Sequence, residues 1–188
     1  MTNEIAQQYL NNLTETINEL DLSAICKVAE TIKHAIKNNK QIFVCGNGGS
    51  AANSNHFVND LVYGIARKTG GGAKAISLSA NNAVMTCLAN DVGYDQIFLE
   101  QLAVQGNPGD VLFVFSGSGN SPNILNVCSY ARENQITVCG FLGYTGGKAL
   151  ALCDHAVHFN IQDMQISEDL QLVVGHILMK DICSMLAG

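Results

Sequence analysis

The chain has 188 residues, of which 47% are hydrophobic and 14% are charged. These values exclude an intrinsically disordered protein and fit a single domain with a buried core. The formal net charge of -6 argues against nucleic acid as the main partner, because a phosphate backbone is bound by a basic surface. A single phosphate ester remains compatible with this charge, since backbone N–H groups and hydroxyls can hold it.

The cysteines and the start of the chain indicate a compartment. There are seven cysteines and no C-x-x-C pair, which favours reduced thiols in a reducing environment. Residues 1–8 are polar and contain no apolar signal core. No apolar run approaches the ~20 residues that a membrane-spanning helix needs. We therefore expect a cytoplasmic protein that binds no membrane.

Two helices are predicted at the start of the chain, from about Asn3 to Asn38, because apolar residues recur there at helical spacing. The apolar run Gln41–Cys45, closed by Gly46, then predicts a first buried strand. The further predicted helices are Ser50–Tyr63, Asn81–Leu88, Asp95–Ala103, Pro122–Glu133, Lys148–Leu152 and Met164–Leu186. The further predicted strands are Lys74–Leu78, Val111–Phe115, Ile136–Leu142 and His155–Phe159.

Strands that alternate with helices and are continuously apolar are typical of a parallel sheet covered on both faces. No linker or low-complexity segment interrupts this pattern. The sequence therefore predicts an α/β fold with a five-stranded parallel sheet, in one domain that spans residues 1–188.

Two turns rich in glycine and serine follow the first and third predicted strands, at Gly46–Ser50 and Ser116–Ser121. Ligands of open parallel sheets bind beyond the carboxyl ends of the strands, where both turns lie. Glycine lets the backbone approach a ligand, and the helix after each turn offers free N–H groups. A tight connection would use the same residues, but two such turns at strand ends favour a phosphate-binding pocket.

Neither of two nucleotide-binding motifs fits these turns fully. The pattern Gly46-x-Gly48-x-x-Ala51 matches one form of the dinucleotide fingerprint, which also needs an acidic residue ~20 positions later. No Asp or Glu lies between Asp60 and Asp91, so a dinucleotide site is not favoured. A P-loop needs a lysine before its Ser or Thr, and neither turn has one.

Two pairs of titratable residues stand at helical spacing. His56 and Asp60 are four residues apart on one helix face, where they could bind zinc or share a proton. Glu168 and His176 are eight residues apart on the last helix and lie loosely on one side. The alternative is a structural role, with the histidines packed or capped and Glu168 stabilising the start of its helix.

Four segments carry a resemblance to a known family. The stretch from Phe43 to Phe57, FVCGNGGSAANSNHF, resembles the start of the sugar isomerase (SIS) domain in the phosphoheptose isomerase group. Leu88–Tyr94, Val114–Ser121 and Glu168–Leu178 resemble the later motifs of that group, in the same order. The resemblance spans residues 40 to 188, and the two N-terminal helices fit it as well. It implies a three-layer SIS domain.

The resemblance also implies roles for individual residues. The position of His56 is a zinc ligand, and that of Asp60 carries a Glu that binds metal and substrate and acts as general base. The position of Glu168 is usually a Gln that contacts zinc and substrate, and that of His176 is a ligand and proton donor. The remaining implied substrate contacts are Asn47, Gly48, Gly49, Asn90 and Asp91, with Ser116, Gly117, Ser118 and Ser121 at the phosphate.

The sequence departs from this pattern twice. Asp60 is one methylene shorter than Glu, and Glu168 is acidic where Gln is common. The added negative charge favours a cation, so zinc stays the expected cofactor. The departures leave the geometry of proton transfer and the exact substrate open.

The implied activity is the conversion of sedoheptulose 7-phosphate to a heptose 7-phosphate through an enediol. The implied assembly is a homotetramer whose pockets take residues from neighbouring subunits, with residues 1–38 as a helical extension used in packing. An apolar stripe would equally cover the domain's own core. The alternatives are a non-catalytic SIS protein, similar to a replication-initiator-associated one, and an isomerase or binder of another phosphosugar. Both histidines beside acids favour an enzyme.

Overall fold

The computed structural model describes residues 3–187 and contains one five-stranded parallel sheet. The strand order is β2-β1-β3-β4-β5, which confirms the predicted α/β class. The strands are β1 (Gln41–Gly46), β2 (Lys74–Ser77), β3 (Val111–Ser116), β4 (Thr137–Leu142) and β5 (His155–His158). Val111 pairs with Ile42 of β1 and with Thr137 of β4, so β3 lies at the centre. Every residue of β3 is buried, as its unbroken apolar sequence predicts.

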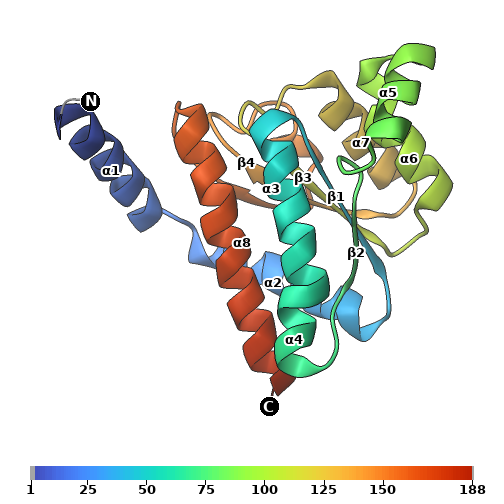
Figure 1. The fold of residues 1–188 in the computed structure, drawn as a ribbon, viewed down its shortest axis with the longest axis horizontal. Coiled ribbons are helices and arrows are strands. Elements are labelled where there is room, and N and C mark those ends of the chain that lie inside the picture. Colours follow the sequence, from blue (N-terminus) through green and yellow to red (C-terminus); the bar gives the residue numbers. More distant parts are fainter. Residues whose placement is uncertain (1–2, 188) are drawn as a thin grey trace.

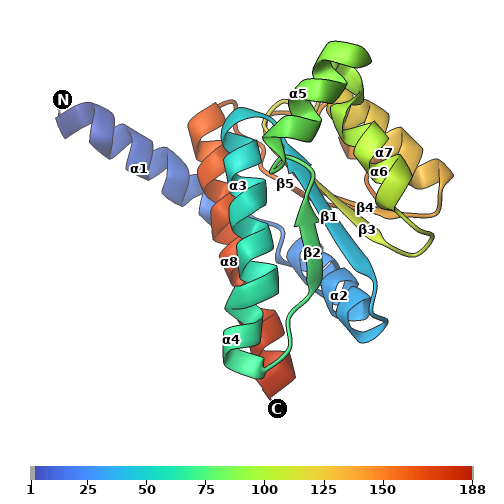
Figure 2. The same cartoon turned by 45° about the vertical axis from the view of Figure 1, so that its right-hand side comes forward.

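Helices cover both faces of the sheet (Figures 1 and 2). One face carries α2 (Leu22–Lys37), α3 (Gly48–Asn59) and α8 (Met164–Ala187). The other carries α6 (Ile97–Gln105) and α7 (Pro122–Glu133), with α5 (Asn82–Asp91) beside them. Short helical segments are α4 (Ile65–Thr69) and the 3-10 turns Tyr94–Gln96 and Leu150–Leu152. The predicted three-layer arrangement is confirmed.

A cluster of phenylalanines forms the centre of the core on the α3 and α8 face. The rings of Phe115 and Phe141 stack with centroids 4.7 Å apart. Phe57 of α3 contacts Phe113, Phe115 and Phe141 at centroid distances of 5.4 Å, 5.6 Å and 5.9 Å. These contacts fix α3 on the sheet directly after the first glycine-rich turn, and so they hold that turn in place.

The helix predicted over Ser50–Tyr63 is interrupted in the structure. It begins as α3, continues as a π-helical turn at Asp60–Gly64 and ends as α4. Hydrophobic periodicity does not reveal this π turn, because the buried residues Phe57, Leu61 and Ile65 recur every four residues, as in an α-helix. Turns of this kind are frequent at functional sites, and this one begins at a candidate site residue, Asp60.

Helix α1 (Asn3–Asn18) projects from the body of the domain (Figures 1 and 2). Ile5 is 65% exposed and Leu10 55% exposed, so much of the apolar stripe of α1 is uncovered. The Tyr9 hydroxyl donates a hydrogen bond of 2.6 Å to Asp169 Oδ2 on α8. Burial and this bond raise the pKa of Tyr9 to about 12. None of the helices within residues 3–187 is long and apolar enough to cross a membrane.

Candidate functional site

A pocket of about 260 Å³ lies at the carboxyl ends of β1 and β3, between the two glycine-rich turns. This is the place where parallel α/β sheets bind ligands. Its lining residues are Asn47, Gly48, Gly49, Ser50, Phe115, Ser116, Gly117, Ser118, Ser121, Met164 and Glu168. The structure therefore brings together eight of the sequence-predicted substrate contacts: Asn47, Gly48, Gly49, Ser116, Gly117, Ser118, Ser121 and Glu168.

The first turn presents the start of α3 to this pocket. Among the hydrogen bonds of residues 3–187, none is donated by the main-chain N–H groups of Gly48, Gly49 or Ser50. A Cβ on Gly49 would lie 2.3 Å from a Glu168 carboxylate oxygen, so a larger residue there would displace the Glu168 side chain. Free N–H groups and the positive end of the α3 dipole suit an anion.

The second turn presents serine hydroxyls. Ser116 Oγ accepts a hydrogen bond of 3.0 Å from the Gly119 N–H, and Ser118 Oγ accepts one of 3.3 Å from the Asn120 N–H. Both oxygens act as acceptors there, so both hydroxyl hydrogens can be donated to a ligand. Ser121, the N-cap residue of α7, makes no side-chain capping bond. We call this pocket, with its serines and the α3 N-terminus, the phosphate cradle.

A second cluster, the His–Asp–His group, consists of His56, Asp60 and His176. The Nε2 atoms of His56 and His176 are 2.9 Å apart. Asp60 Oδ2 lies 3.4 Å from the first of these nitrogens and 3.6 Å from the second. All three potential ligand atoms fall within 4.8 Å of one another. The predicted neighbourhood of His56 and Asp60 on one helix face is confirmed, and α8 adds His176 to it.

The donor set of this group fits a metal ion. Asp60 is 8% exposed, and its Oδ2 atom has no hydrogen-bond partner among the described residues. A buried carboxylate oxygen without a partner is costly unless a cation or a proton satisfies it. Two imidazole nitrogens and one carboxylate oxygen are ligands that zinc accepts. The arrangement can therefore hold a metal ion, and Asp60 can also act as a base.

Glu168 does not join this group within one chain. Its carboxylate packs against Gly49 in the phosphate cradle, and it stands eight residues before His176 on α8. Eight helical residues rise ~12 Å along the axis. Because α3 and α8 run side by side in the same direction (Figures 1 and 2), the cradle and the His–Asp–His group lie at separate levels of this helix pair.

Asn90 and Asp91 lie away from both clusters, on the exposed end of α5. Asn90 Nδ2 donates a hydrogen bond of 2.8 Å to Asp91 Oδ1. This bond, with a second one from Cys87, holds the pKa of Asp91 below its usual value. Neither residue lines the cradle, so their predicted contact with substrate stays a prediction.

Two residues near the cradle, Asn123 and Tyr94, were not predicted as site residues from the sequence. Asn123 of α7 is 1% exposed and forms two hydrogen bonds of 2.9 Å with the Asn47 side chain. The Tyr94 hydroxyl donates a third bond of 2.9 Å to Asn47 Oδ1. Each comes from a different segment of the chain, so only tertiary structure joins them. The sequence feature that could have indicated Asn123 is its place directly after Pro122, the first residue of α7.

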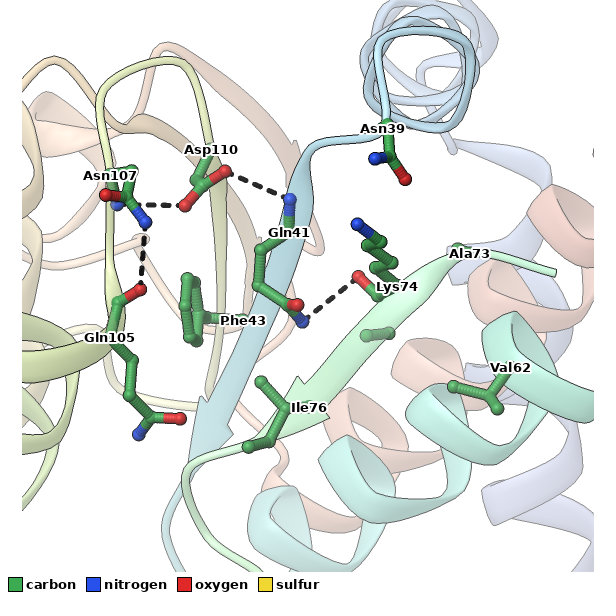
Figure 3. Close-up of a pocket in the computed structure, with 11 residues that line it drawn as sticks. Asn39, Gln41, Phe43, Val62, Ala73, Lys74, Ile76, Gln105, Asn107 and Asp110 are labelled. Carbon is green, nitrogen blue, oxygen red and sulfur yellow. Dashed lines mark hydrogen bonds between the residues drawn. The ribbon is translucent and has the colours of Figure 1, made fainter.

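A larger hollow, of about 680 Å³, lies at the opposite end of β1 and beside the edge strand β2 (Figure 3). Its buried acid, Asp110, accepts hydrogen bonds from the main-chain N–H groups of Gln41 and Asn107. The Gln41 side chain donates to the Lys74 carbonyl. These groups are satisfied by the protein itself, and none of the predicted site residues lines this hollow. The candidate site is therefore the cradle with the His–Asp–His group.

Comparison with known proteins agrees with the fold. The SIS domain family model matches residues 7–143, and the chain belongs to this family. A phosphoheptose isomerase of Helicobacter hepaticus is 37% identical over 155 residues, which are 82% of this chain and 79% of that protein. A phosphoheptose isomerase of Burkholderia pseudomallei is 34% identical over 178 residues, 95% of this chain and 90% of that protein. Within the SIS family, the chain belongs to the phosphoheptose isomerase group.

A solved structure has the same fold over nearly the whole chain. A phosphoheptose isomerase from Francisella tularensis covers 98% of this chain and 100% of its own, with a TM-score of 0.90 and 27% sequence identity. The alignment covers nearly all of this chain, so the N-terminal helices are part of the shared structure.

Proposed function

We propose that the protein is a phosphoheptose isomerase that converts sedoheptulose 7-phosphate to D-glycero-D-manno-heptose 7-phosphate. The observation that carries the proposal is the pairing of a serine-rich phosphate cradle, which reaches the start of α3 and α8, with a His–Asp–His group further along these two helices. The names of the 30–37% identical relatives support it. The cradle fits the phosphate, and the His–Asp–His group fits the reacting end of the sugar.

Asp60 is the proposed base. The residue is 8% exposed and its carboxylate has two oxygens, so one can bind a metal ion while the other accepts a proton. The proton passes from the hydroxyl-bearing carbon next to the carbonyl to Asp60, the electron pair of the broken C–H bond forms the C=C bond of an enediol, and the carbonyl oxygen takes up a proton. His176, which lies beside Asp60, then gives a proton to the former carbonyl carbon, while the hydroxyl oxygen on the first carbon loses its proton and becomes the aldehyde oxygen. Asp60 and His176 are therefore the proposed catalytic residues.

Zinc is the proposed cofactor. His56, Asp60 and His176 would hold it, and the orphaned Oδ2 of Asp60 supports this ligand set. When bound, the ion would polarise the carbonyl and hydroxyl oxygens of the sugar. Glu168 is the proposed fourth ligand, and because it lies ~12 Å along α8 from His176, it would have to come from another copy of the chain.

A homotetramer is the proposed assembly, in which each cradle faces the His–Asp–His group of a neighbouring subunit. The ~12 Å separation of the two clusters along α8 supports this arrangement. The exposed apolar residues of α1, such as Ile5 and Leu10, support the use of residues 1–38 in packing. The proposed compartment is the cytoplasm, which the seven free cysteines support.

Turnover of sedoheptulose 7-phosphate by the full-length protein tests the function, with added zinc and with a chelator. We expect zinc-dependent aldose formation, and a loss of ~10²–10⁴-fold in kcat for Asp60→Asn and His176→Ala. His34→Ala is the matched control, because His34 is an exposed histidine of α2 outside both clusters. Normal turnover in both site variants would contradict the assignment.

A second candidate is an isomerase of another phosphosugar. Asp60 is a shorter acid than the Glu that the group's resemblance implies, so the base would reach less far from α3. Comparing turnover across ketose phosphates of different chain length separates the two candidates. A preference for a shorter ketose phosphate by tenfold or more in kcat/KM would favour the second.

A further inference from the structure

Asn47 stands at the N-cap position of α3 and does not cap it. Its φ of -109 and ψ of 151 are the extended backbone angles of an ordinary N-cap residue. An N-cap asparagine normally accepts a hydrogen bond from an N–H group of the first helical turn. Its side chain makes no such bond here, so the N–H groups of Gly49 and Ser50 remain free at the cradle.

Two other helices of the same chain have the usual cap. Asn81, the N-cap residue of α5, accepts a hydrogen bond of 3.2 Å from the Val84 N–H. Asp21 caps α2 in the same way through the N–H groups of Ser23 and Ala24. The missing cap at Asn47 is therefore a property of its surroundings and not of the residue type.

The side chain of Asn47 is held by two residues outside α3. Asn123 donates to Asn47 Oδ1 and accepts from Asn47 Nδ2, each at 2.9 Å, and it is 1% exposed. The Tyr94 hydroxyl also donates to Asn47 Oδ1 at 2.9 Å. The oxygen that would cap α3 thus already accepts two hydrogen bonds, which is the usual capacity of an amide oxygen.

We propose that Asn123, helped by Tyr94, is a positioning residue that holds the Asn47 side chain away from the α3 N-terminus, so that the Gly49 and Ser50 N–H groups stay available to a sugar-phosphate oxygen. The inference rests on the proposed function for its ligand, a phosphorylated sugar. Asn123 touches Asn47 and not the cradle itself, since it is absent from the lining. It acts by preventing a cap that would otherwise compete with the ligand for the same donors.

Amide hydrogen exchange in the ligand-free protein tests directly whether Asn123 keeps Asn47 from capping α3. In Asn123→Ala the oxygen of Asn47 loses one of its two donors, and in the Tyr94→Phe/Asn123→Ala double variant it loses both. We expect exchange at Gly49 and Ser50 to slow by about fivefold or more in the double variant, because Asn47 then caps them. The single variants should slow it less. Tyr94 is 55% exposed, so Tyr94→Phe keeps the test usable if Asn123→Ala fails to fold.

The matched control is Asn134→Ala. Asn134 is the C-cap residue of α7, at the other end of this helix from Asn123, and its side chain donates to the Tyr130 carbonyl. Exchange at Gly49 and Ser50 should be unchanged in this variant. A purely structural role for Asn123 predicts faster exchange in Asn123→Ala, because the turn would loosen. Faster or unchanged exchange in the Asn123 variants would overturn the proposal.

Kinetics give the second readout. With sedoheptulose 7-phosphate we expect the KM of the double variant to rise about tenfold while kcat stays within about twofold, since the lost donors bind the ligand and take no part in proton transfer. An unchanged KM would overturn the proposal. If the wild-type protein turns over no heptose phosphate, the proposed function fails, whereas the exchange measurement still decides the role of Asn123.

Discussion

Glu168 places a carboxylate in a pocket whose other features suit an anion. It packs against Gly49, at the end of α3 whose free N–H groups attract negative charge. In the absence of a cation, Glu168 and a phosphate would repel each other across the same pocket. Glu168 is therefore expected to weaken phosphate binding as long as no cation balances its charge.

Glu168→Gln tests this reading. The amide has nearly the same shape but no charge, so inorganic phosphate should bind the metal-free protein more tightly, by about threefold to tenfold at low salt. Isothermal titration calorimetry in chelator measures the affinity. Glu133→Gln, at the exposed end of α7, is the control and should have no effect. An affinity that is unchanged in Glu168→Gln would mean that the carboxylate does not act on the phosphate.

The elements themselves were largely predictable from the sequence. The helix Pro122–Glu133 has the predicted bounds, because Pro122 supplies a preset φ at the first helical position. The buried strands β1, β3 and β4 were found from unbroken apolar runs, within one residue at each end. The π-helical turn at Asp60 was not predictable, since periodicity alone does not reveal one inserted residue.

The candidate site was predictable in part. Residues close in sequence, such as His56 with Asp60, and residues of one turn, such as Ser116 with Ser118, were placed together correctly. The separation of Glu168 from the His–Asp–His group was missed, because eight residues of helix return to a similar face but rise ~12 Å. The contact of Asn123 with Asn47 depends on how the neighbouring strands β1 and β3 bring the start of α7 to the turn before α3, which local patterns do not specify.

The turn after β3 depends on a glycine at position 119. Gly119 has a φ of 63, and a Cβ there would lie 2.0 Å from the Gly146 carbonyl oxygen. Gly119→Ala should therefore displace the serine turn, weaken phosphate binding at least tenfold and lower stability by about 1–3 kcal/mol. Phosphate titration and thermal unfolding measure both effects.

Gly71→Ala is the matched control for this substitution. A Cβ on Gly71 meets no atom within 4 Å, and its φ is not in the left-handed region. The phosphate affinity of the Gly71→Ala variant should equal that of the wild type. If Gly119→Ala also bound phosphate normally, the serine turn would not hold the ligand.

Helix α1 is joined to α8 by a hydrogen bond that depends on pH. The pKa of Tyr9 is about 12 in the folded chain and about 10 in an unfolded one. A raised pKa means that Tyr9 keeps its proton in the folded state at a pH where it loses it in the unfolded state. The contribution of this hydrogen bond to stability is therefore complete below pH ~10 and is lost as the pH rises through ~12. Ultraviolet titration of wild type minus Tyr9→Phe should give a tyrosine that ionises near pH 12. A midpoint near pH 10 would contradict the docking of Tyr9 on Asp169.

The two chemical clusters of the molecule meet the same pair of helices, α3 and α8, at different levels. The cradle lies at the start of α3 and α8, and the His–Asp–His group lies about two turns further along. His56 and His176 are each close to half exposed, at 46% and 48% of the side chain, so their outer edges are open to another molecule. A second copy of the chain could therefore bring its own cluster to this surface.

Subunit mixing tests whether one site is shared by two chains. Ser118→Asp places a charge in the cradle and His176→Ala removes a ligand from the other cluster, so each variant alone should be inactive. In oligomers assembled from equal amounts of both variants, half of the chains have an intact cradle and the other half have an intact His–Asp–His group. A site that is shared by two chains is intact only when it combines one chain of each kind in the right order, which has a chance of one half times one half. The mixture should then recover about a quarter of wild-type activity. Activity equal to the sum of the two inactive variants would mean that each chain carries a complete site.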